Sequence, residues 1–256
     1  MFRLILTTAA FAGLIWGAPQ LSLEGLDIDG RIVGGNNTTI ETHPYIVSVQ
    51  ELNNHVCGGS IIAANWILSA AHCFTANTTA YSIRAGSTFR NTGGQVINVS
   101  RIIIHQSHNR ATLDYDIALL QLNSSITTIA ARAVSLAAQG GAPLAGTTAT
   151  VTGWGALSED GPLASILQVI NVPIISQANC RIAYGQNTIT DRMFCAGVLG
   201  VGGKDACFND AGGPLIAGGM LTGIVSWGYG CALPNYPGVY ASVPNLRTWI
   251  RNVTGL

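Results

Sequence analysis

Three parts of the chain carry side chains that can move protons or hold a charge. His72 lies next to Cys73, and Asp116 stands at the head of an apolar run. Asp205 and Asp210 lie together in a segment rich in glycine. An imidazole takes up and releases protons near neutral pH, and a neighbouring carboxylate can orient it. These residue types point to acid–base chemistry, provided that the fold brings them together.

Five short motifs surround these residues in a fixed order. They are Ile32-Val33-Gly34-Gly35, Ala70-Ala71-His72-Cys73, Asp116-Ile117-Ala118-Leu119-Leu120, Asp210-Ala211-Gly212-Gly213-Pro214 and Ser226-Trp227-Gly228. Each motif alone is a weak signal, but five in this order, framed by cysteines, are a strong one. Over residues 32–256 the chain closely resembles the trypsin branch of the chymotrypsin-fold serine proteases. The resemblance implies an all-β fold of two packed six-stranded barrels with a C-terminal helix.

The resemblance also implies a role for each residue of a hydrolytic centre. In that family a serine hydroxyl attacks the substrate, a histidine takes its proton and a buried aspartate orients the imidazole. His72 matches the histidine and Asp116 the aspartate, with Asp114 as a nearby alternative. Ala211 stands where the family has its serine, and a methyl group cannot attack a carbonyl. We therefore expect a homologue without catalytic activity.

A second position close to Ala211 departs from the family pattern. Asn209 replaces a glycine whose backbone N–H, together with that of residue 211, forms the oxyanion hole. Asparagine tolerates a positive φ better than other non-glycine residues, so the N–H can keep its direction. Its side chain, however, is large enough to crowd the hole. Because two neighbouring positions differ, natural divergence is favoured over an engineered exchange of the serine alone.

The residues that match the family's specificity pocket are present. Asp205 matches the carboxylate that pairs with a substrate Arg or Lys, and such charge-assisted contacts are strong in a partly dry pocket. Gly228 and Gly238 match glycines that leave the pocket open, and Trp227 matches its aromatic wall. Ser226 matches a position that supports the aspartate and lines the substrate strand. The expected partner is a peptide or protein segment with Arg or Lys.

The N-terminal part of the sequence is expected to be removed in two steps. Residues 1–18 contain one basic residue and an apolar run too short to span a bilayer comfortably, which fits a secretory signal peptide. Residues 19–31 then form an activation propeptide, and residues 32–256 form the protease domain. Arg31 implies a trypsin-like activating protease. Ile32 matches the new N-terminus, whose ammonium ion pairs with Asp210 in the family.

Six cysteines agree with an extracellular location, because oxidising compartments favour disulfides. None has the Cys-x-x-Cys spacing of a metal or redox site. Pairing in sequence order would join Cys57 to Cys73, Cys180 to Cys195 and Cys207 to Cys231, although the pattern alone does not select this connectivity. Sites for glycosylation in such a compartment are Asn36, Asn37, Asn77, Asn98, Asn123 and Asn252.

Composition limits the function classes further. The chain has 12 basic and 12 acidic residues, so its formal charge of zero excludes nucleic-acid capture by bulk charge. After the signal peptide, no segment is apolar for long enough to cross a membrane. The other histidines show no metal-ligand spacing, and residues 85–95 lack the carboxylates of a calcium site. We therefore expect no metal, no cofactor and no membrane partner, and a monomer.

Short strands are the elements expected to position these residues. Clusters of Gly, Asn and Pro separate strand-like segments at the spacing of barrels or sandwiches. The first series covers residues 45–50, 59–62, 66–69, 81–85, 95–105 and 117–122. The second covers residues 147–153, 167–174, 193–196, 214–217, 223–227 and 238–243. The two barrels would span roughly residues 32–138 and 139–243. Only the end is predicted to be helical, over residues 244–253, because apolar residues recur there at helical spacing.

The leading hypothesis is a secreted homologue of trypsin-like proteases that binds basic peptides without cutting them. The main alternative is an active trypsin-like endopeptidase cleaving after Arg or Lys, with Ala211 as a sequence variant or an engineered change. A third class, a lectin or scaffold that acts through its outer surface, has no sequence feature of its own. Turnover of an Arg-containing chromogenic peptide, together with binding of a small amidine, separates the three.

Overall fold

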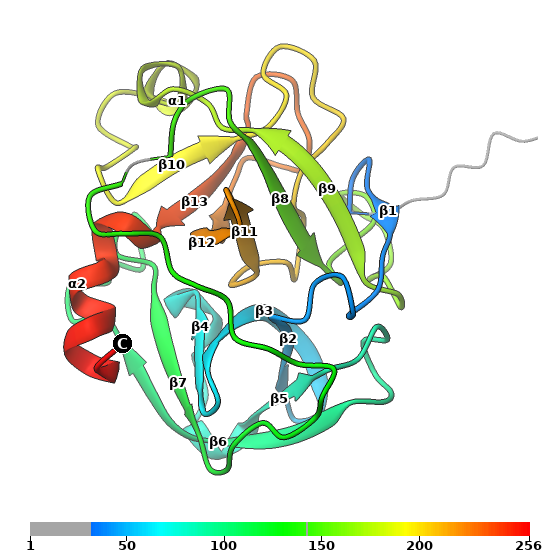
Figure 1. The fold of residues 1–256 in the computed structure, drawn as a ribbon. Helices are drawn as coiled ribbons and strands as arrows, with labels where there is room; N and C mark the ends of the chain where they lie inside the picture. The colour runs from blue at the N-terminus through cyan, green and yellow to red at the C-terminus, as the bar shows by residue number, and fades with distance from the viewer. Residues whose placement is uncertain (1–31, 142) are drawn as a thin grey trace, which may run out of the picture.

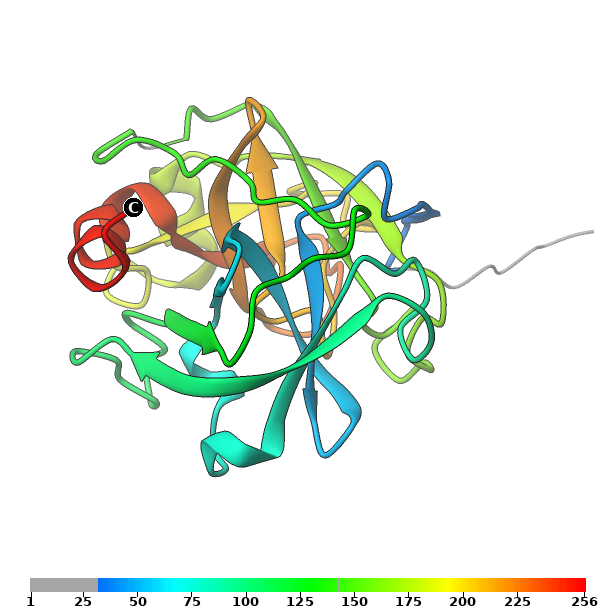
Figure 2. The same ribbon diagram turned by 60° about the horizontal axis from the view of Figure 1, so that its bottom comes forward.

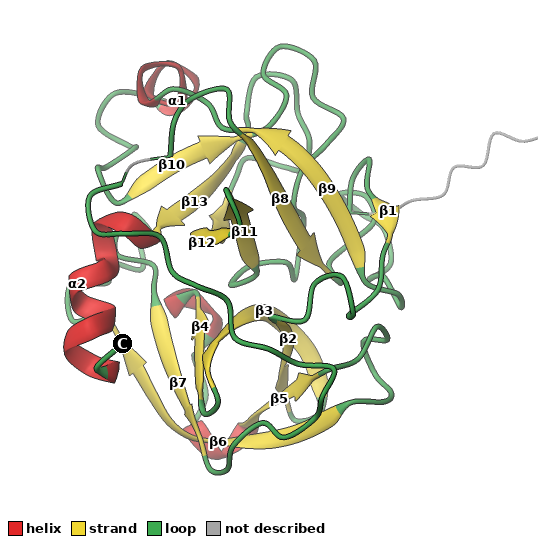
Figure 3. Ribbon diagram, in the orientation of Figure 1, coloured by secondary structure: helices red, strands yellow, loops and turns green. Residues whose placement is uncertain are grey.

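The computed structural model describes residues 32–141 and 143–256. The predicted signal peptide and propeptide, including Arg31, lie outside the described residues. Strands account for most of the regular structure, as Figure 3 shows. They form two sheets that lie one above the other in Figure 1, with the first half of the chain in the lower sheet. Among the described residues, no helix has the length and apolar character needed to cross a membrane.

The lower sheet is a closed barrel of six antiparallel strands in the order β2-β3-β4-β7-β6-β5. Its strands are β2 (Ile46–Glu51), β3 (Asn54–Ala63), β4 (Trp66–Ser69), β5 (Tyr81–Ala85), β6 (Gln95–Ile104) and β7 (Ala118–Leu122). The strand β3 begins five residues before its predicted start at Gly59, because residues 54–58 pair with β2 across a tight hairpin. Leu52 and Asn53 form the turn of this hairpin with positive φ values of 49° and 67°, as two-residue hairpins require.

The upper sheet is open and follows the order β1-β9-β8-β11-β12-β13-β10. Its strands are β1 (Asn36–Asn37), β8 (Thr148–Gly153), β9 (Gln168–Pro173), β10 (Met193–Ala196), β11 (Pro214–Ala217), β12 (Met220–Trp227) and β13 (Gly238–Ser242). The predicted all-β fold of two packed barrel-like sheets is confirmed, although the upper sheet has seven strands in place of the predicted six and does not close. The edge strand β1 was not predicted: it precedes the lower barrel in sequence, yet it pairs with β9 of the upper sheet.

Two α-helices accompany the sheets. The C-terminal helix α2 (Val243–Thr254) agrees with the prediction and buries Leu246 and Ile250. The prediction that only this end is helical was wrong, because Gln177–Tyr184 forms a second helix, α1. The helix α1 has only eight residues, so its apolar period is limited to Cys180 and Tyr184, which are four residues apart and buried. The hydroxyl of Ser176 caps its start by accepting the N–H of Asn179, and the helix ends at Gly185.

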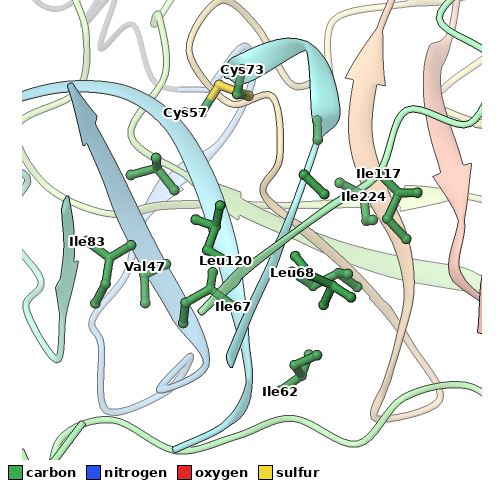
Figure 4. Packing of buried hydrophobic residues seen from close by; sticks show 14 of the residues in the cluster. Val47, Cys57, Ile62, Ile67, Leu68, Cys73, Ile83, Ile117, Leu120 and Ile224 are labelled. Carbon is green, nitrogen blue, oxygen red and sulfur yellow. A yellow bond between two sulfur atoms is a disulfide. The ribbon is translucent and has the colours of Figure 1, made fainter. Parts of the chain in front are cut away.

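The largest group of buried side chains fills the lower barrel and extends beyond it. Val47, Ile67 and Leu120 from three different strands are completely buried at its centre, and Figure 4 shows them with their neighbours. Ile224 from β12 of the upper sheet packs in the same group, as do the buried residues of α2. Figures 1 and 2 both show α2 on the side of the molecule opposite β1. The two sheets therefore share a core.

Three disulfides join Cys57 to Cys73, Cys180 to Cys195 and Cys207 to Cys231. This is the sequential pairing, which is thus confirmed. The first disulfide ties β3 to the short 3₁₀ turn Ala71–Cys73, as Figure 4 shows. That turn carries His72, so the disulfide restrains the backbone around this residue.

Candidate active site

His72 and Asp116 meet because the strands next to them are paired. The turn Ala71–Cys73 follows β4, Asp116 precedes β7, and Ser69 of β4 pairs with Ala118 of β7. Nδ1 of His72 lies 2.7 Å from Oδ2 of Asp116, and the His72 backbone N–H donates to Oδ1 at 2.9 Å. The carboxylate is completely buried, whereas the imidazole is 30% exposed. One face of the imidazole therefore remains accessible.

Asp116 is held in its charged form. Burial alone would raise the pKa of this carboxyl group, but hydrogen bonds from His72 and Ser226 outweigh it and keep the pKa below its usual value. The Ser226 hydroxyl donates to Oδ2 at 2.6 Å. Because a carboxylate only accepts hydrogen bonds, Nδ1 of His72 carries the hydrogen in this pair. The Nε2 atom is thus left as the proton-accepting position of the neutral ring.

The alternative carboxylate, Asp114, has a different partner. Its two oxygens accept hydrogen bonds from Arg192 at 2.6 and 3.1 Å, and Oδ1 also accepts one from the Thr190 hydroxyl. Asp114 therefore ties the loop before β7 to the segment before β10.

Asp116 has one further neighbour, His108, that sequence reasoning missed. Nδ1 of the buried His108 lies 4.0 Å from Oδ1 of Asp116, a proximity that no motif signals.

A cavity of about 460 Å³ opens beside the histidine. His72, Asn209 and Ala211 line it together with the residues of the predicted pocket: Asp205, Ser226, Trp227, Gly228 and Gly238. Ser226 is the one aliphatic hydroxyl among the described residues that line the cavity, and it is committed to Asp116. The cysteines in its wall are disulfide-bonded. The cavity thus contains an oriented base with no side-chain nucleophile.

Asn209 keeps the backbone conformation that glycine adopts easily. Its φ is 69°, in the left-handed region that asparagine tolerates. The side chain does not fold back toward the backbone N–H groups: its Nδ2 donates to the carbonyl oxygens of His55 and Val56 on β3, at 3.3 and 3.2 Å. The ring of His55 in turn contacts the Asn209 carbonyl oxygen at 3.0 Å. The expected crowding by this side chain is therefore relieved by its attachment to the lower barrel.

Asp205 lies in the wall of the cavity with one oxygen satisfied and one unsatisfied. Oδ2 accepts the Ala232 N–H at 3.1 Å, whereas Oδ1 has no partner among the described residues. Burial raises the pKa of Asp205 to about 7, although backbone N–H groups partly oppose the shift. A side chain at Gly238 would collide with Oδ1, since an added Cβ would lie 2.5 Å from it. A Cβ added at Gly228 would make only ordinary van der Waals contacts, with no atom closer than 3.7 Å.

Sequence reasoning missed one aromatic side chain that lines the cavity and a cluster of three that packs near the lining residue Trp227. Tyr240 lines the cavity from β13, two residues after Gly238 and therefore on the same face of the strand, a spacing that could have revealed it. Tyr184, Tyr229 and Tyr236 form a cluster in which the ring centroids of Tyr184 lie 5.2 and 5.6 Å from the other two. Tyr184 comes from α1, so only the tertiary structure brings it there.

The segment after Arg31 is inserted into the upper half of the molecule. Ile32 is fully buried in a cluster with residues of the upper sheet, and the carbonyl of Val33 accepts the N–H of Asp205 at 3.2 Å. Asp210 is also buried, and its oxygens accept the N–H groups of Gly155 and Cys207 at 2.8 and 3.0 Å. Burial raises the pKa of Asp210 to about 7. A carboxylate in such surroundings is stabilised by a nearby cation.

Comparison with known proteins identifies the group to which the chain is related. The family model described as Trypsin matches residues 32–250. The chain belongs to the trypsin family of serine proteases. Among curated relatives, Trypsin Blo t 3 from Blomia tropicalis is 47% identical over 229 residues, which cover 87% of this chain and 86% of that protein. Trypsin alpha from Drosophila melanogaster is 43% identical over 257 residues, which cover 98% and 97%.

The likeness to trypsins thus extends through both sheets. Trypsin delta from Drosophila melanogaster is 42% identical over 98% of this chain and 98% of its own length. Asn209 and Ala211 are the two residues for which the sequence analysis predicts a departure from the family motif. Both residues line the cavity together with His72.

Proposed function

We propose that this protein is a catalytically silent homologue of trypsin that binds segments with Arg or Lys. The observation that carries the proposal is the alanine at position 211, in a cavity where His72, Asp116 and Ser226 keep their hydrogen bonds. Deletion of the nucleophilic serine in a comparable protease lowers kcat by about 10⁶, or roughly 8–9 kcal/mol of barrier. Such a protein shows no measurable turnover in an ordinary peptidase assay.

The preference for basic side chains rests on Asp205. Its unsatisfied Oδ1 lies inside a partly enclosed cavity, where a carboxylate gains much from a charged donor. A guanidinium or ammonium group would satisfy this oxygen and restore the ionised form of the acid. Gly228 and Gly238 leave the space that a long side chain needs to reach it. The ligand would be an extended peptide segment that is held at its basic residue.

Secretion and proteolytic processing belong to the same proposal. Three disulfides favour an oxidising compartment, and all six asparagines of the Asn-x-Ser/Thr sites are exposed. A trypsin-like protease would cut after Arg31, and the new ammonium group of Ile32 would neutralise the buried Asp210. In this form the protein would act as a monomer that shields basic sites or serves as a protein cofactor.

The proposal is tested with protein that has been cleaved after Arg31. We expect benzamidine to bind with an affinity that Asp205→Asn abolishes, while an Arg-containing chromogenic peptide is not hydrolysed. Turnover that scales with protein concentration and is blocked by a serine-directed covalent inhibitor would favour the alternative, an active trypsin-like endopeptidase. That alternative draws support from the names of the relatives. Absence of benzamidine binding would instead contradict the proposal that the cavity at Asp205 binds basic side chains, and it would favour a function on the outer surface.

A further inference from the structure

The first strand of the upper sheet carries two overlapping acceptor sequences for N-linked glycans. Asn36 and Asn37 form β1, and each is followed two positions later by a threonine, Thr38 or Thr39. Both asparagines are exposed, and neither lines the cavity that contains His72. The pocket for basic side chains therefore gives no reason for this pair of acceptor sequences.

The position of β1 leaves space for a bulky group. Among the described strands, β1 pairs only with β9, and it is the outermost strand of the open upper sheet (Figure 1). The free edge of such a strand can pair with another chain, and native proteins usually cover it or place charges on it. A glycan on β1 would cover this edge with hydrated carbohydrate.

The side chains of the two asparagines lie on different faces of the sheet. Residues directly opposite each other in an antiparallel pair share a face, and successive residues alternate between faces. Asn37 is opposite the buried Gln168, whose Nε2 donates to Oδ1 of Asn37 at 2.8 Å. Asn36 is opposite Val169, which is only half-buried. Asn36 is therefore the acceptor that can carry a glycan away from the core.

Asn36 is also close in sequence to the bond that processing would break. Only four residues, 32–35, separate the Arg31–Ile32 bond from Asn36. Four residues span at most ~14 Å even when they are fully extended. The sheet fixes the far end of this short connection, since the Thr38 N–H donates to the carbonyl oxygen of Leu167 at 2.8 Å directly after β1. An activating protease with Arg31 in its cleft must therefore come close to Asn36.

We propose that Asn36 carries an N-linked glycan that slows cleavage after Arg31. This inference rests on the proposed function, since it requires a secreted chain that is processed at Arg31. The glycan comes from a lipid-linked oligosaccharide of the secretory pathway. Nδ2 of Asn36 forms a bond to C1 of the first sugar, the bond from C1 to the lipid pyrophosphate breaks, and Nδ2 loses one proton. The carbohydrate then acts by excluding the protease from the space beside the cleavage site.

The first measurement locates the glycan on the full chain secreted from a glycosylating host cell. An amidase removes the glycans in water labelled with heavy oxygen, which converts each glycosylated Asn into a labelled Asp. Peptide mass mapping should find the label at Asn36. Thr39→Ala destroys only the acceptor sequence of Asn37 and should keep this label, whereas Thr38→Ala destroys only that of Asn36 and should abolish it. Wild-type protein without label at Asn36 would overturn the inference.

The second measurement is the rate of cleavage after Arg31. The uncleaved glycoprotein is incubated with a small amount of active trypsin, and the new N-terminus at Ile32 is followed by mass spectrometry. Removal of the glycans from the folded wild-type protein should raise the second-order rate constant at least ~5-fold, because steric restriction of the encounter is relieved. The double variant Asn36→Gln, Thr39→Ala lacks both acceptor sequences of β1 and should be cleaved at the same raised rate.

Asn98→Gln is the matched control for a general effect of carbohydrate. Asn98 is an exposed acceptor on β6 of the lower barrel, far in sequence from Arg31. Loss of a glycan there should leave the rate of cleavage unchanged. A rise in Asn98→Gln as large as that in the β1 double variant would show that the glycan at Asn36 has no specific effect, and the inference would be wrong.

The remaining results separate this inference from the proposed function. Equal cleavage rates with and without the glycan at Asn36 would overturn the inference alone. If no form is cleaved after Arg31, the proposed processing is wrong and the inference falls with it. After cleavage, glycosylated and deglycosylated protein should bind benzamidine with equal affinity, because β1 does not line the cavity at Asp205. A difference between these affinities would contradict an effect through protease access alone.

Discussion

At the scale of single residues, the side chain of Ala211 lacks the hydroxyl oxygen with which a serine would act as a nucleophile. His72 still carries the hydrogen bonds that orient an imidazole as a base, and Asp116 remains charged because His72 and Ser226 outweigh its burial. Asn209 retains the positive φ of a glycine position by anchoring its side chain on β3. The surroundings of the missing hydroxyl have therefore stayed compatible with catalysis.

Restoring that oxygen should restore hydrolysis. We expect Ala211→Ser together with Asn209→Gly to raise kcat/KM for an Arg-containing chromogenic peptide by at least ~10³, part of the roughly 10⁶ that the nucleophile supplies. Because the Asn209 side chain is turned toward β3, Ala211→Ser alone should recover most of this gain. The assay uses cleaved protein, and His72→Ala in the serine variant is the control that must abolish turnover. A correctly folded and processed double variant without activity would contradict the view that the rest of the centre is intact.

The ionisation of Asp205 predicts how binding depends on pH. A cation requires the carboxylate, and burial raises the pKa of the free acid to about 7. The affinity for benzamidine should therefore be complete above pH 7 and should fall about 10-fold for each pH unit below it, because protonation of Asp205 competes with the ligand. Calorimetry between about pH 5.5 and pH 8.5 measures this. A flat profile in the wild-type protein would show that Asp205 is ionised throughout, contrary to its buried position.

At the scale of elements, the loop before β7 and the segment before β10 are joined by one ion pair. Arg192 donates to both oxygens of Asp114, and its guanidinium lies 4.7 Å from the ring centre of Tyr115. The pair is partly buried, with 28% of the arginine side chain and 16% of the aspartate exposed. It connects segments of the lower and upper halves of the molecule close to Asp116.

Removal of this pair should destabilise the fold more than removal of an exposed one. We expect Arg192→Ala to lower the free energy of unfolding by about 1–2 kcal/mol, since a partly buried carboxylate loses its two charged hydrogen bonds and keeps only neutral donors such as the Thr190 hydroxyl. Arg181→Ala is the matched control: it breaks a pair with Asp191, whose side chain is 79% exposed, and should cost no more than ~0.5 kcal/mol. Denaturant unfolding at neutral pH measures both. Equal effects of the two substitutions would show that burial does not strengthen the Asp114 pair.

At the scale of the whole molecule, the cavity draws its residues from both halves. His72 follows β4 of the lower barrel and is hydrogen-bonded to Asp116, whereas Asp205, Ala211 and Ser226 belong to the second half of the chain. The buried Ile32 and the contact between Val33 and Asp205 also tie the N-terminal segment to the pocket. Binding at Asp205 should therefore depend on the state of that segment.

Cleavage after Arg31 should strengthen binding of benzamidine. The new ammonium group of Ile32 would pair with Asp210, keep that carboxylate charged and order the backbone next to Asp205. We expect the cleaved protein to bind at least ~10-fold more tightly than an uncleavable Arg31→Gln protein, with the gain lost as pH rises through the pKa of the amine, which pairing raises above its usual value near 8. Asp210→Asn serves as the control in which cleavage brings no gain. Equal affinities for benzamidine before and after cleavage would show that the new N-terminus does not affect binding at Asp205.

The sequence by itself determined the elements with strong local signals, and it predicts an altered catalytic centre. The strands at Trp66–Ser69, Tyr81–Ala85, Met193–Ala196 and Pro214–Ala217 were predicted with their observed bounds, because they are short segments of strand length and three of them end directly before a glycine. The motifs around His72, Asp116 and residue 211 are likewise runs of consecutive residues, so they can be found in the sequence without knowledge of the fold. The α1 helix was missed because its eight residues are too few to show a helical repeat, although Cys180 and Tyr184 are both buried.

Only the tertiary structure decided which groups meet. The choice of Asp116 over Asp114, the pairing of β1 with β9, the position of His108 and the attachment of Asn209 to β3 all join residues distant in sequence. The raised pKa values of Asp205 and Asp210 have the same origin, since burial is a property of the packed chain. Local sequence sets backbone preference and side-chain chemistry, but contact and desolvation arise when separate strands pack together.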